Sequence, residues 1–207
     1  MAARKGVLLV ISAPSGTGKS TLVRELLSRM EEVEFSISFT TRPPRDGEQD
    51  GRHYHFIRRE RFQAMIEAGE FLEWADVFQE KYGTGRSVTM EKLSSGRDLI
   101  LDIDIQGGRQ VRASGIDAVS VFILPPDYST LKSRLRNRGS DSEQQVATRL
   151  AKARCEAEEV RYYDYVVVHD DLESAVGQLM TILSAERLRA GRRQPETLAV
   201  LSTFPTE

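Results

Sequence analysis

Apolar residues form four short runs along the chain, and each run has the composition of a buried strand. Residues 7–11, 98–105, 119–124 and 165–168 are dominated by Val, Ile and Leu. Continuous β-branched and leucine runs of this length are typical of strands covered on both faces of a parallel sheet. We therefore predict four core strands.

Between these runs, apolar residues recur at helical spacing. The spacing predicts a helix over 22–30 and further helices over 127–138, 142–160 and 171–190, the last three each preceded by capping residues. Strands that alternate with helices predict an α/β fold, with a mostly parallel sheet flanked by helices.

Residues 34–85 interrupt this alternation. Pro43-Pro44 and Asp46-Gly47 mark turns, and residues 53–57 alternate like an exposed strand. We interpret the segment as a small, mainly β insertion, and the helical hairpin after the third core strand as a flap. The expected parts are a core of 1–33, 86–126 and 160–190, an insertion over 34–85, a lid over 127–159, and a loose C-terminal tail over 191–207.

Composition narrows the class of protein. The 207 residues include 29 Lys+Arg and 31 Asp+Glu, a net charge of −2 that argues against a protein that coats nucleic acid. The single cysteine, Cys155, excludes a disulfide framework and a multi-cysteine zinc site. No stretch approaches the 18 apolar residues of a membrane span. The apolar run near the N-terminus, residues 7–11, is too short for a secretory signal. We expect a cytoplasmic protein with no membrane or nucleic-acid partner.

The loop after the first strand carries the main chemical signal. Residues 13–20 match the phosphate-loop pattern G-x-x-x-x-G-K-[ST] at Gly18, Lys19 and Ser20, with Ala13 in place of the first glycine. The loop leaves a buried strand and enters an amphipathic helix, the setting in which backbone N–H groups bind phosphate. Lys19 would then reach the β- and γ-phosphates of a nucleotide, and the Ser20 hydroxyl would bind Mg²⁺. The alternative is an ordinary glycine-rich turn.

Two aspartates at the end of the second core strand suggest a partner for this magnesium ion. Alternation places Asp102 and Asp104 on the same face of the predicted strand. An aspartate at this position would hold an Mg²⁺-bound water. Sequence does not separate the two, and a pair of capping carboxylates is the alternative.

The insertion offers a second anion site. Arg42 and Arg45 lie three residues apart around Pro43-Pro44, and guanidinium groups bind a doubly charged phosphate bidentately. This predicts a phosphorylated acceptor substrate.

Several ordered segments together resemble the guanylate kinase family. The resemblance extends from about residue 6 to residue 189 and rests on residues 38–48, 51–54, 71–75, 81–84, 101–107, 122–126 and 136–139. It implies a P-loop NTPase core with a GMP-binding insertion and a helical lid. The implied reaction is Mg²⁺-dependent transfer of the ATP γ-phosphate to GMP or dGMP, giving ADP and GDP.

The resemblance also implies roles at matching positions. The implied catalytic residues are Lys19, Arg42, Arg134, Arg138 and Arg149. The implied ATP-binding residues are Ala13, Pro14, Ser15, Gly16, Thr17, Gly18, Lys19, Ser20, Thr21 and His169. The implied GMP-binding residues are Ser38, Arg42, Arg45, Glu48, Tyr54, Glu73, Tyr82, Gly83, Thr84, Asp102 and Asp104. The implied metal ligands are Ser20 and Asp102.

The chemistry of guanine independently supports the role of Glu73. Guanine presents N1–H and N2–H₂ side by side as donors, and one carboxylate accepts from both, whereas adenine would leave the carboxylate unpaired.

His169 departs from the family pattern. Relatives commonly carry an asparagine at this position, where it helps hold the adenine. The histidine therefore leaves open how selective the protein is for ATP as the phosphate donor.

Three rival functions need to be weighed. One is a kinase for AMP, UMP or dTMP, and another is a catalytically silent guanylate-kinase-like module that binds phosphopeptides. Such modules generally lack the complete phosphate loop found here. The third is nucleic-acid binding by the cluster of Arg187, Arg189, Arg192 and Arg193, which fits a solvated helix end or a contact in a homo-oligomer better.

Overall fold

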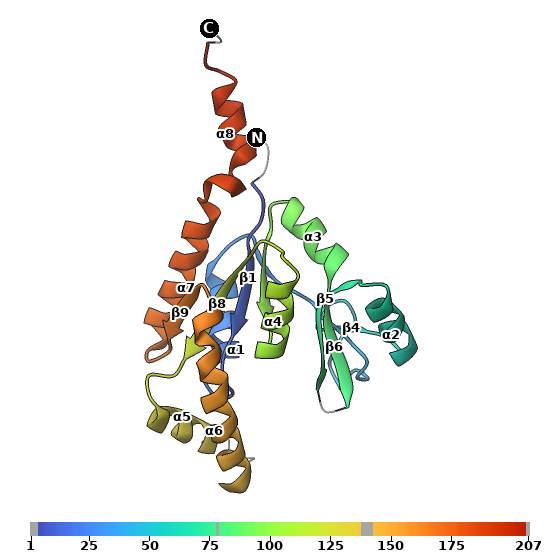
Figure 1. Ribbon diagram of the computed structural model, residues 1–207, viewed down its shortest axis with the longest axis vertical. Helices are drawn as coiled ribbons and strands as arrows, with labels where there is room; N and C mark the ends of the chain where they lie inside the picture. The colour runs from blue at the N-terminus through green and yellow to red at the C-terminus, as the bar shows by residue number, and fades with distance from the viewer. Residues whose placement is uncertain (1–3, 78, 138–142, 206–207) are drawn as a thin grey trace.

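The computed structural model describes residues 4–77, 79–137 and 143–205. Its core is a five-stranded sheet in the order β2-β7-β1-β8-β9, with every neighbouring pair parallel. The strands are β1 (Leu8–Ser12), β2 (Val33–Phe35), β7 (Asp98–Asp102), β8 (Ala118–Leu124) and β9 (Tyr165–Val168). The predicted α/β class with a parallel sheet flanked by helices is confirmed (Figure 1).

Alternate residues of the central strands face two different helical layers. Leu9 and Ile11 of β1 pack with Leu22 and Leu26 of α1 (Lys19–Arg29). The same cluster includes Leu179 and its apolar neighbours on α7 (Leu172–Arg187). Burying both faces explains why these strands have continuous apolar runs rather than alternating ones.

The opposite face of the sheet supports the rest of the chain. Leu8 and Val10 pack there with Leu93 of α3 (Arg86–Ser94) and Val111 of α4 (Ile105–Ala113). Leu72 of β5 (Phe71–Val77) joins the same cluster, so the insertion is attached to the core through apolar packing.

The insertion forms its own four-stranded sheet in the order β4-β3-β6-β5. Its elements are β3 (Phe39–Thr40), β4 (His55–Phe56), α2 (Arg59–Glu67), β5 (Phe71–Val77) and β6 (Glu80–Gly85). Phe62 and Met65 of α2 pack with Phe71. Sequence reasoning did not predict α2, and the strand expected over 53–57 is shorter, at His55–Phe56.

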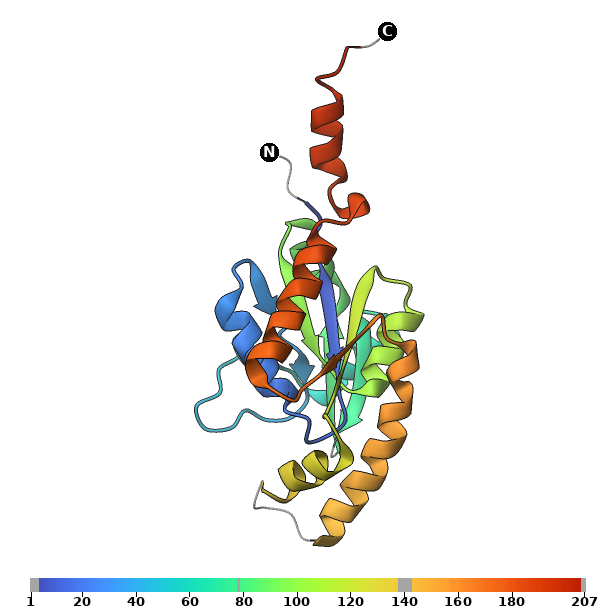
Figure 2. The ribbon, with the colours of Figure 1, turned by 90° about the vertical axis from the view of Figure 1, so that its left-hand side faces the viewer.

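Helices α5 (Tyr128–Arg136) and α6 (Glu143–Ala157) pack against each other beyond the carboxyl ends of the strands (Figure 2). Asp127 caps α5 by accepting from the Thr130 N–H at 2.7 Å, as predicted. The 3₁₀ helix η1 (Glu158–Tyr162) connects α6 to β9.

The core sheet also differs from the sequence expectations. β2 pairs with β7, so the core sheet extends past the boundary set at residue 34. The strand expected over 98–105 ends at Asp102, and Asp104 instead caps α4 by accepting from the Gly107 N–H at 2.9 Å. Because the chain turns between them, the two aspartates do not share one face of a strand.

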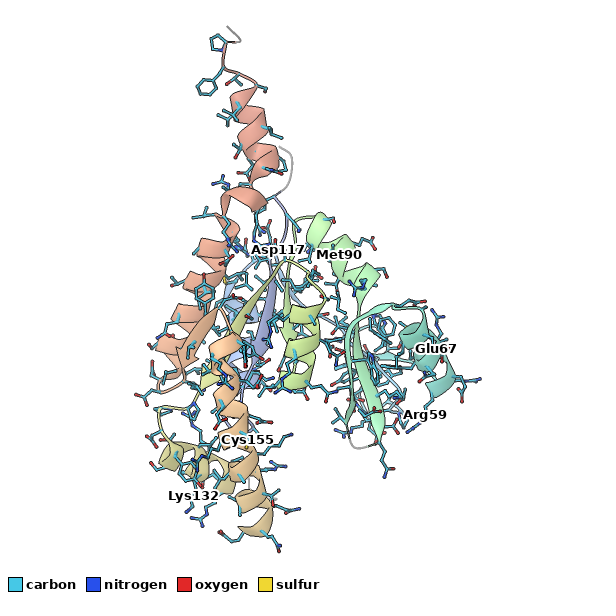
Figure 3. All side chains as sticks on the ribbon, viewed as in Figure 1. Arg59, Glu67, Met90, Asp117, Lys132 and Cys155 are labelled. Atoms are coloured by element: carbon cyan, nitrogen blue, oxygen red, sulfur yellow. The ribbon has the colours of Figure 1, made fainter. Side chains whose placement is uncertain are left out.

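The tail over 191–207, expected to be loose, contains the 3₁₀ helix η2 (Ala190–Arg192) and α8 (Gln194–Leu201). The Arg192 side chain is buried and pairs with Asp117 at 2.9 Å. Figure 3 marks Asp117 at the end of the core from which α8 projects, and Lys132 in the lid at the other end. Among the described residues, no helix is both long and apolar enough to cross a membrane.

Candidate nucleotide site

The phosphate loop lies where β1 delivers the chain to α1. Gly16 and Gly18 have φ values of 94° and 88°, a region that side chains strongly disfavour. The Gly18 carbonyl accepts the first hydrogen bonds of α1, from Thr21 at 3.1 Å and Leu22 at 3.2 Å. The N–H groups of Lys19 and Ser20, which lie between Gly18 and Thr21, are therefore at the positive end of the helix dipole, as anion binding requires.

Lys19 lies between the loop and the neighbouring strand end. Its Nζ is 2.5 Å from Asp102 Oδ1 and donates to the Ile103 carbonyl at 2.8 Å. The structure therefore brings Lys19 and Asp102 together at the carboxyl ends of β1 and β7. Ser20, in the first turn of α1, is exposed.

Two helices of the predicted lid, α5 and α6, contact the phosphate loop. Leu135 of α5 packs over Gly16, where an added Cβ would lie 2.7 Å from the leucine Cδ2. Glu156 of α6 accepts from the Ser15 N–H at 3.4 Å, a contact that sequence reasoning missed. Helices α5 and α6 therefore both contact the phosphate loop directly.

Arg134 and His169 converge on the carbonyl of Thr17. Arg134 donates to this oxygen at 3.2 Å, and His169 Nδ1 lies 2.7 Å from it. Arg149 lies half-buried on α6. Arg138, the third lid arginine, falls outside the described residues.

A buried carboxylate lies on the side of the insertion that faces α4 of the core. Glu73 of β5 pairs in register with Thr84 of β6, whose hydroxyl donates to Glu73 Oε1 at 2.6 Å. Only 6% of Glu73 is exposed, and burial, with a smaller contribution from the charge of Asp104, raises the pKa of its carboxyl. The position is therefore suited to a ligand that presents hydrogen-bond donors.

Gly107, in the first turn of α4, makes this arrangement possible. A Cβ added there would lie 2.8 Å from Glu73 Oε2. Sequence reasoning gave Gly107 no role, although the Gly107-Gly108 pair near a helix start was the available signal. The glycine allows α4 of the core to approach the carboxylate of the insertion.

Cationic and aromatic side chains gather around Pro43-Pro44, a segment called the proline corner below. Arg42 pairs with Glu48 at 2.8 Å, and Glu48 also accepts from the Arg45 N–H at 2.8 Å. These contacts hold the pKa of Glu48 at about 2. The Arg42 guanidinium lies 5.5 Å from the Tyr54 ring centroid, which is 5.8 Å from that of Tyr82.

The remaining predicted GMP-binding residues lie on the insertion and at the start of α4. The Ser38 carbonyl accepts from the His55 N–H at 2.9 Å. Gly83 lies against Phe71, where a Cβ would be 2.9 Å from the ring. Asp104 is exposed at the start of α4, where its side chain accepts from the Gly107 N–H.

A glycine loop at the carboxyl end of a central parallel strand, with a lysine and an aspartate beside it, defines a phosphate-loop protein of the nucleotide kinase class. The guanylate kinase family model matches residues 5–186. The chain belongs to the guanylate kinase family.

Individual relatives agree with this family. The chain is 48% identical over 190 residues to a guanylate kinase of Neisseria gonorrhoeae, covering 92% of this chain and 93% of that one. It is 50% identical over 198 residues to a guanylate kinase of Cereibacter sphaeroides, covering 95% and 93%. A crystal structure of guanylate kinase from Anaplasma phagocytophilum covers 100% of both chains, with 34% identity and a TM-score of 0.75.

Proposed function

We propose that the protein transfers the γ-phosphate of ATP to GMP or dGMP, producing ADP and GDP. The observation that carries this proposal is the buried Glu73 carboxylate, fixed by Thr84 at 2.6 Å on the insertion. A carboxylate in this position accepts from both N1–H and N2–H₂ of guanine, and adenine offers neither donor. Family membership supports the same reaction.

The proline corner would bind the GMP phosphate. The residues proposed for this clamp are Arg42, Arg45, Tyr54 and Tyr82, with Ser38 and Gly83 completing the guanine pocket around Glu73 and Thr84. Glu48 already pairs with Arg42 at 2.8 Å, so it holds the guanidinium in place before the substrate arrives. Phosphate binding would add a second anionic partner to the same arginine.

The phosphate loop would bind the ATP phosphates. Lys19 would exchange its contact with Asp102 for one with the transferred phosphate, since the loop and Nζ converge at one end of the sheet. The Ser20 hydroxyl and the Asp102 carboxylate fit Mg²⁺, which prefers oxygen ligands and retains waters. When bound, Mg²⁺ would neutralise charge on the phosphates.

Electrostatic compensation is the main demand of this reaction. Both substrates are anions, so their approach requires cations beyond Lys19. We assign this role to the lid arginines Arg134, Arg138 and Arg149, together with Arg42. The attacking phosphate oxygen of GMP is already ionised near neutral pH, so no general base is required.

We infer that the insertion and the lid close around both substrates. Residues 34–85 would carry GMP and residues 127–159 would cover ATP, which excludes water and limits ATP hydrolysis. We place the reaction in the cytoplasm, where both nucleotides are available.

The basic cluster near the C-terminus does not favour nucleic-acid binding. Each of its four arginines has a carboxylate partner: Arg187 with Asp98, Arg189 with Glu186, Arg192 with Asp117, and Arg193 with Glu196. These four ion pairs reduce the positive charge that the cluster presents to a nucleic-acid backbone. A homo-oligomer remains a proposal, and light scattering would measure it.

An acceptor screen tests the function. ADP formation is followed with Mg-ATP and, in turn, GMP, dGMP, AMP, UMP and dTMP. GMP and dGMP should be phosphorylated, and the other acceptors should react at least several hundredfold more slowly. Comparable turnover of AMP, UMP or dTMP would favour the rival kinases, and no turnover with any acceptor would favour the binding module.

A further inference from the structure

The His169 ring contacts one backbone carbonyl of the phosphate loop. Its Nδ1 lies 2.7 Å from the Thr17 oxygen. The histidine follows β9, and its own N–H donates to the Leu124 carbonyl at 2.8 Å. Only 8% of the residue is exposed, so both its backbone and its ring are fixed by the core.

The partner atom determines which ring nitrogen carries hydrogen. A carbonyl oxygen has no proton and only accepts. Nδ1 of His169 must therefore be protonated and donate, whether the ring is neutral or cationic. The contact is thus a hydrogen bond with an assigned direction.

Arg134 completes a closed triangle of contacts. Its two terminal nitrogens donate to the Thr17 carbonyl at 3.2 Å and to the His169 carbonyl at 3.1 Å. The loop carbonyl is therefore held by donors from both the core and the lid.

Holding this carbonyl also orients the next N–H group. The peptide between Thr17 and Gly18 is trans, as are all others described. A trans peptide directs its C=O and N–H to opposite sides. Because the oxygen points to His169, the Gly18 N–H points to the opposite side, away from the histidine.

The ring also fixes the shape of the loop at Gly18. A Cβ added at Gly18 would lie 2.7 Å from His169 Cε1 and 2.9 Å from Nδ1. The imidazole thus occupies the space that any side chain at this position would need. Ring and glycine together hold the backbone at a φ of 88°.

We propose that His169 is a positioning residue for phosphate binding, which acts on the ATP phosphates through the Thr17–Gly18 peptide. This inference rests on the proposed function for its kinetic consequences. It differs from a contact with the adenine base, because it requires no base on the ligand.

A matched pair of substitutions tests the proposal. His169→Asn places an amide nitrogen the same number of bonds from Cβ as Nδ1, so it retains a donor. His169→Leu has nearly the shape of asparagine without that donor. The probes are ATP and sodium tripolyphosphate, which has the phosphates but no base, and their binding is measured by titration calorimetry.

We expect H169L to weaken both ligands by about tenfold, equivalent to about 1.4 kcal/mol. H169N should bind both within about threefold of the unsubstituted protein. In the kinetic assay H169L should raise KM for ATP and leave KM for GMP unchanged. If H169L loses ATP but retains tripolyphosphate, the histidine contacts the base and the proposal is wrong.

The proposal also fails if H169N binds as weakly as H169L. Thermal unfolding monitors the fold of each variant, and His169→Met supplies a more adaptable side chain without a donor if H169L does not fold. Tripolyphosphate binding requires no turnover. The test therefore stands even if the acceptor screen contradicts the kinase assignment.

Discussion

Replacing Glu73 with glutamine keeps the shape of the side chain and removes its charge. In the structure Oε1 accepts from the Thr84 hydroxyl at 2.6 Å, and Oε2 lies on the side of Gly107. A glutamine presents one acceptor and one NH₂ group, so it cannot accept from two neighbouring guanine donors. One donor of GMP would therefore lose its partner in a site that is only 6% exposed.

The expected cost follows from this geometry. A hydrogen bond to a charged group contributes about 1.5–3 kcal/mol, and each 1.4 kcal/mol is about a factor of ten. E73Q should therefore lower kcat/KM for GMP by about 10- to 150-fold. KM for ATP should remain unchanged, because the phosphate loop belongs to the core.

The same substitution should not destabilise the fold. Burial raises the pKa of Glu73 in the folded protein, so the unfolded chain ionises first as pH rises above the ordinary value of 4.5. Across that window the carboxyl group lowers the free energy of unfolding. At neutral pH E73Q should be as stable as the unsubstituted protein or more stable.

Steady-state kinetics with GMP and AMP across pH, together with thermal unfolding, measure these effects. The phosphate of GMP itself titrates at a pH of about 6, so the informative quantity is the ratio of kcat/KM between the two proteins. The ratio should fall toward one as acid protonates Glu73. Unchanged GMP kinetics in E73Q would refute the assignment of guanine recognition to this carboxylate.

Two further substitutions test parts of the site, and a third tests the stability of the fold. Lys19→Met should lower kcat by at least about 100-fold while far-UV circular dichroism is unchanged, and a rate near that of the unsubstituted protein would contradict the role of the phosphate loop. Gly107→Ala places a Cβ 2.8 Å from Glu73 Oε2, so KM for GMP should rise about tenfold without a change for ATP; equal shifts for both substrates would indicate a general distortion. Asp98→Ala removes a buried carboxylate that accepts from two arginines and a backbone N–H. It should cost about 3–5 kcal/mol, a fall in Tm of roughly 10 °C in calorimetry, and an unchanged Tm would show that these contacts contribute little.

The sequence predicted the central strands well because their burial is encoded locally. The runs at residues 119–124 and 165–168 are apolar apart from Ser120, and both form strands in the five-stranded sheet. β2 could not be found in this way. Val33–Phe35 is only three residues long and contains a glutamate, and its place beside β7 is decided by contacts far along the chain.

The errors at the site have similar causes. Asp102 and Asp104 alternate in sequence as strand residues would, but Asp104 accepts from the Gly107 N–H, so a helix begins where a longer strand was expected. α8 has apolar residues that remain exposed, such as Leu198 at 63% and Val200 at 59%, and no amphipathic pattern indicated a helix there. The loop itself was predictable because its glycines and Lys19 stand adjacent in sequence.

Partners from distant segments were beyond reach. Nothing in the sequence indicates that His169 lies beneath Thr17, 152 residues earlier, or that Lys19 pairs with Asp102 before a nucleotide binds. Such contacts depend on how strands are ordered in the sheet, which local patterns do not specify.

The contacts of Arg192 hold the beginning and the end of the folded body together. The Lys5 N–H donates to the Arg192 carbonyl at 3.0 Å, and the Arg192 side chain donates to the Gly6 carbonyl at 3.3 Å. This junction lies at the amino end of β1, whereas the phosphate loop lies at its carboxyl end. A short linker joining residue 193 to residue 4 would therefore give a circular permutant, with new termini opened in a surface turn such as that at Gly115 and both nucleotide sites left intact.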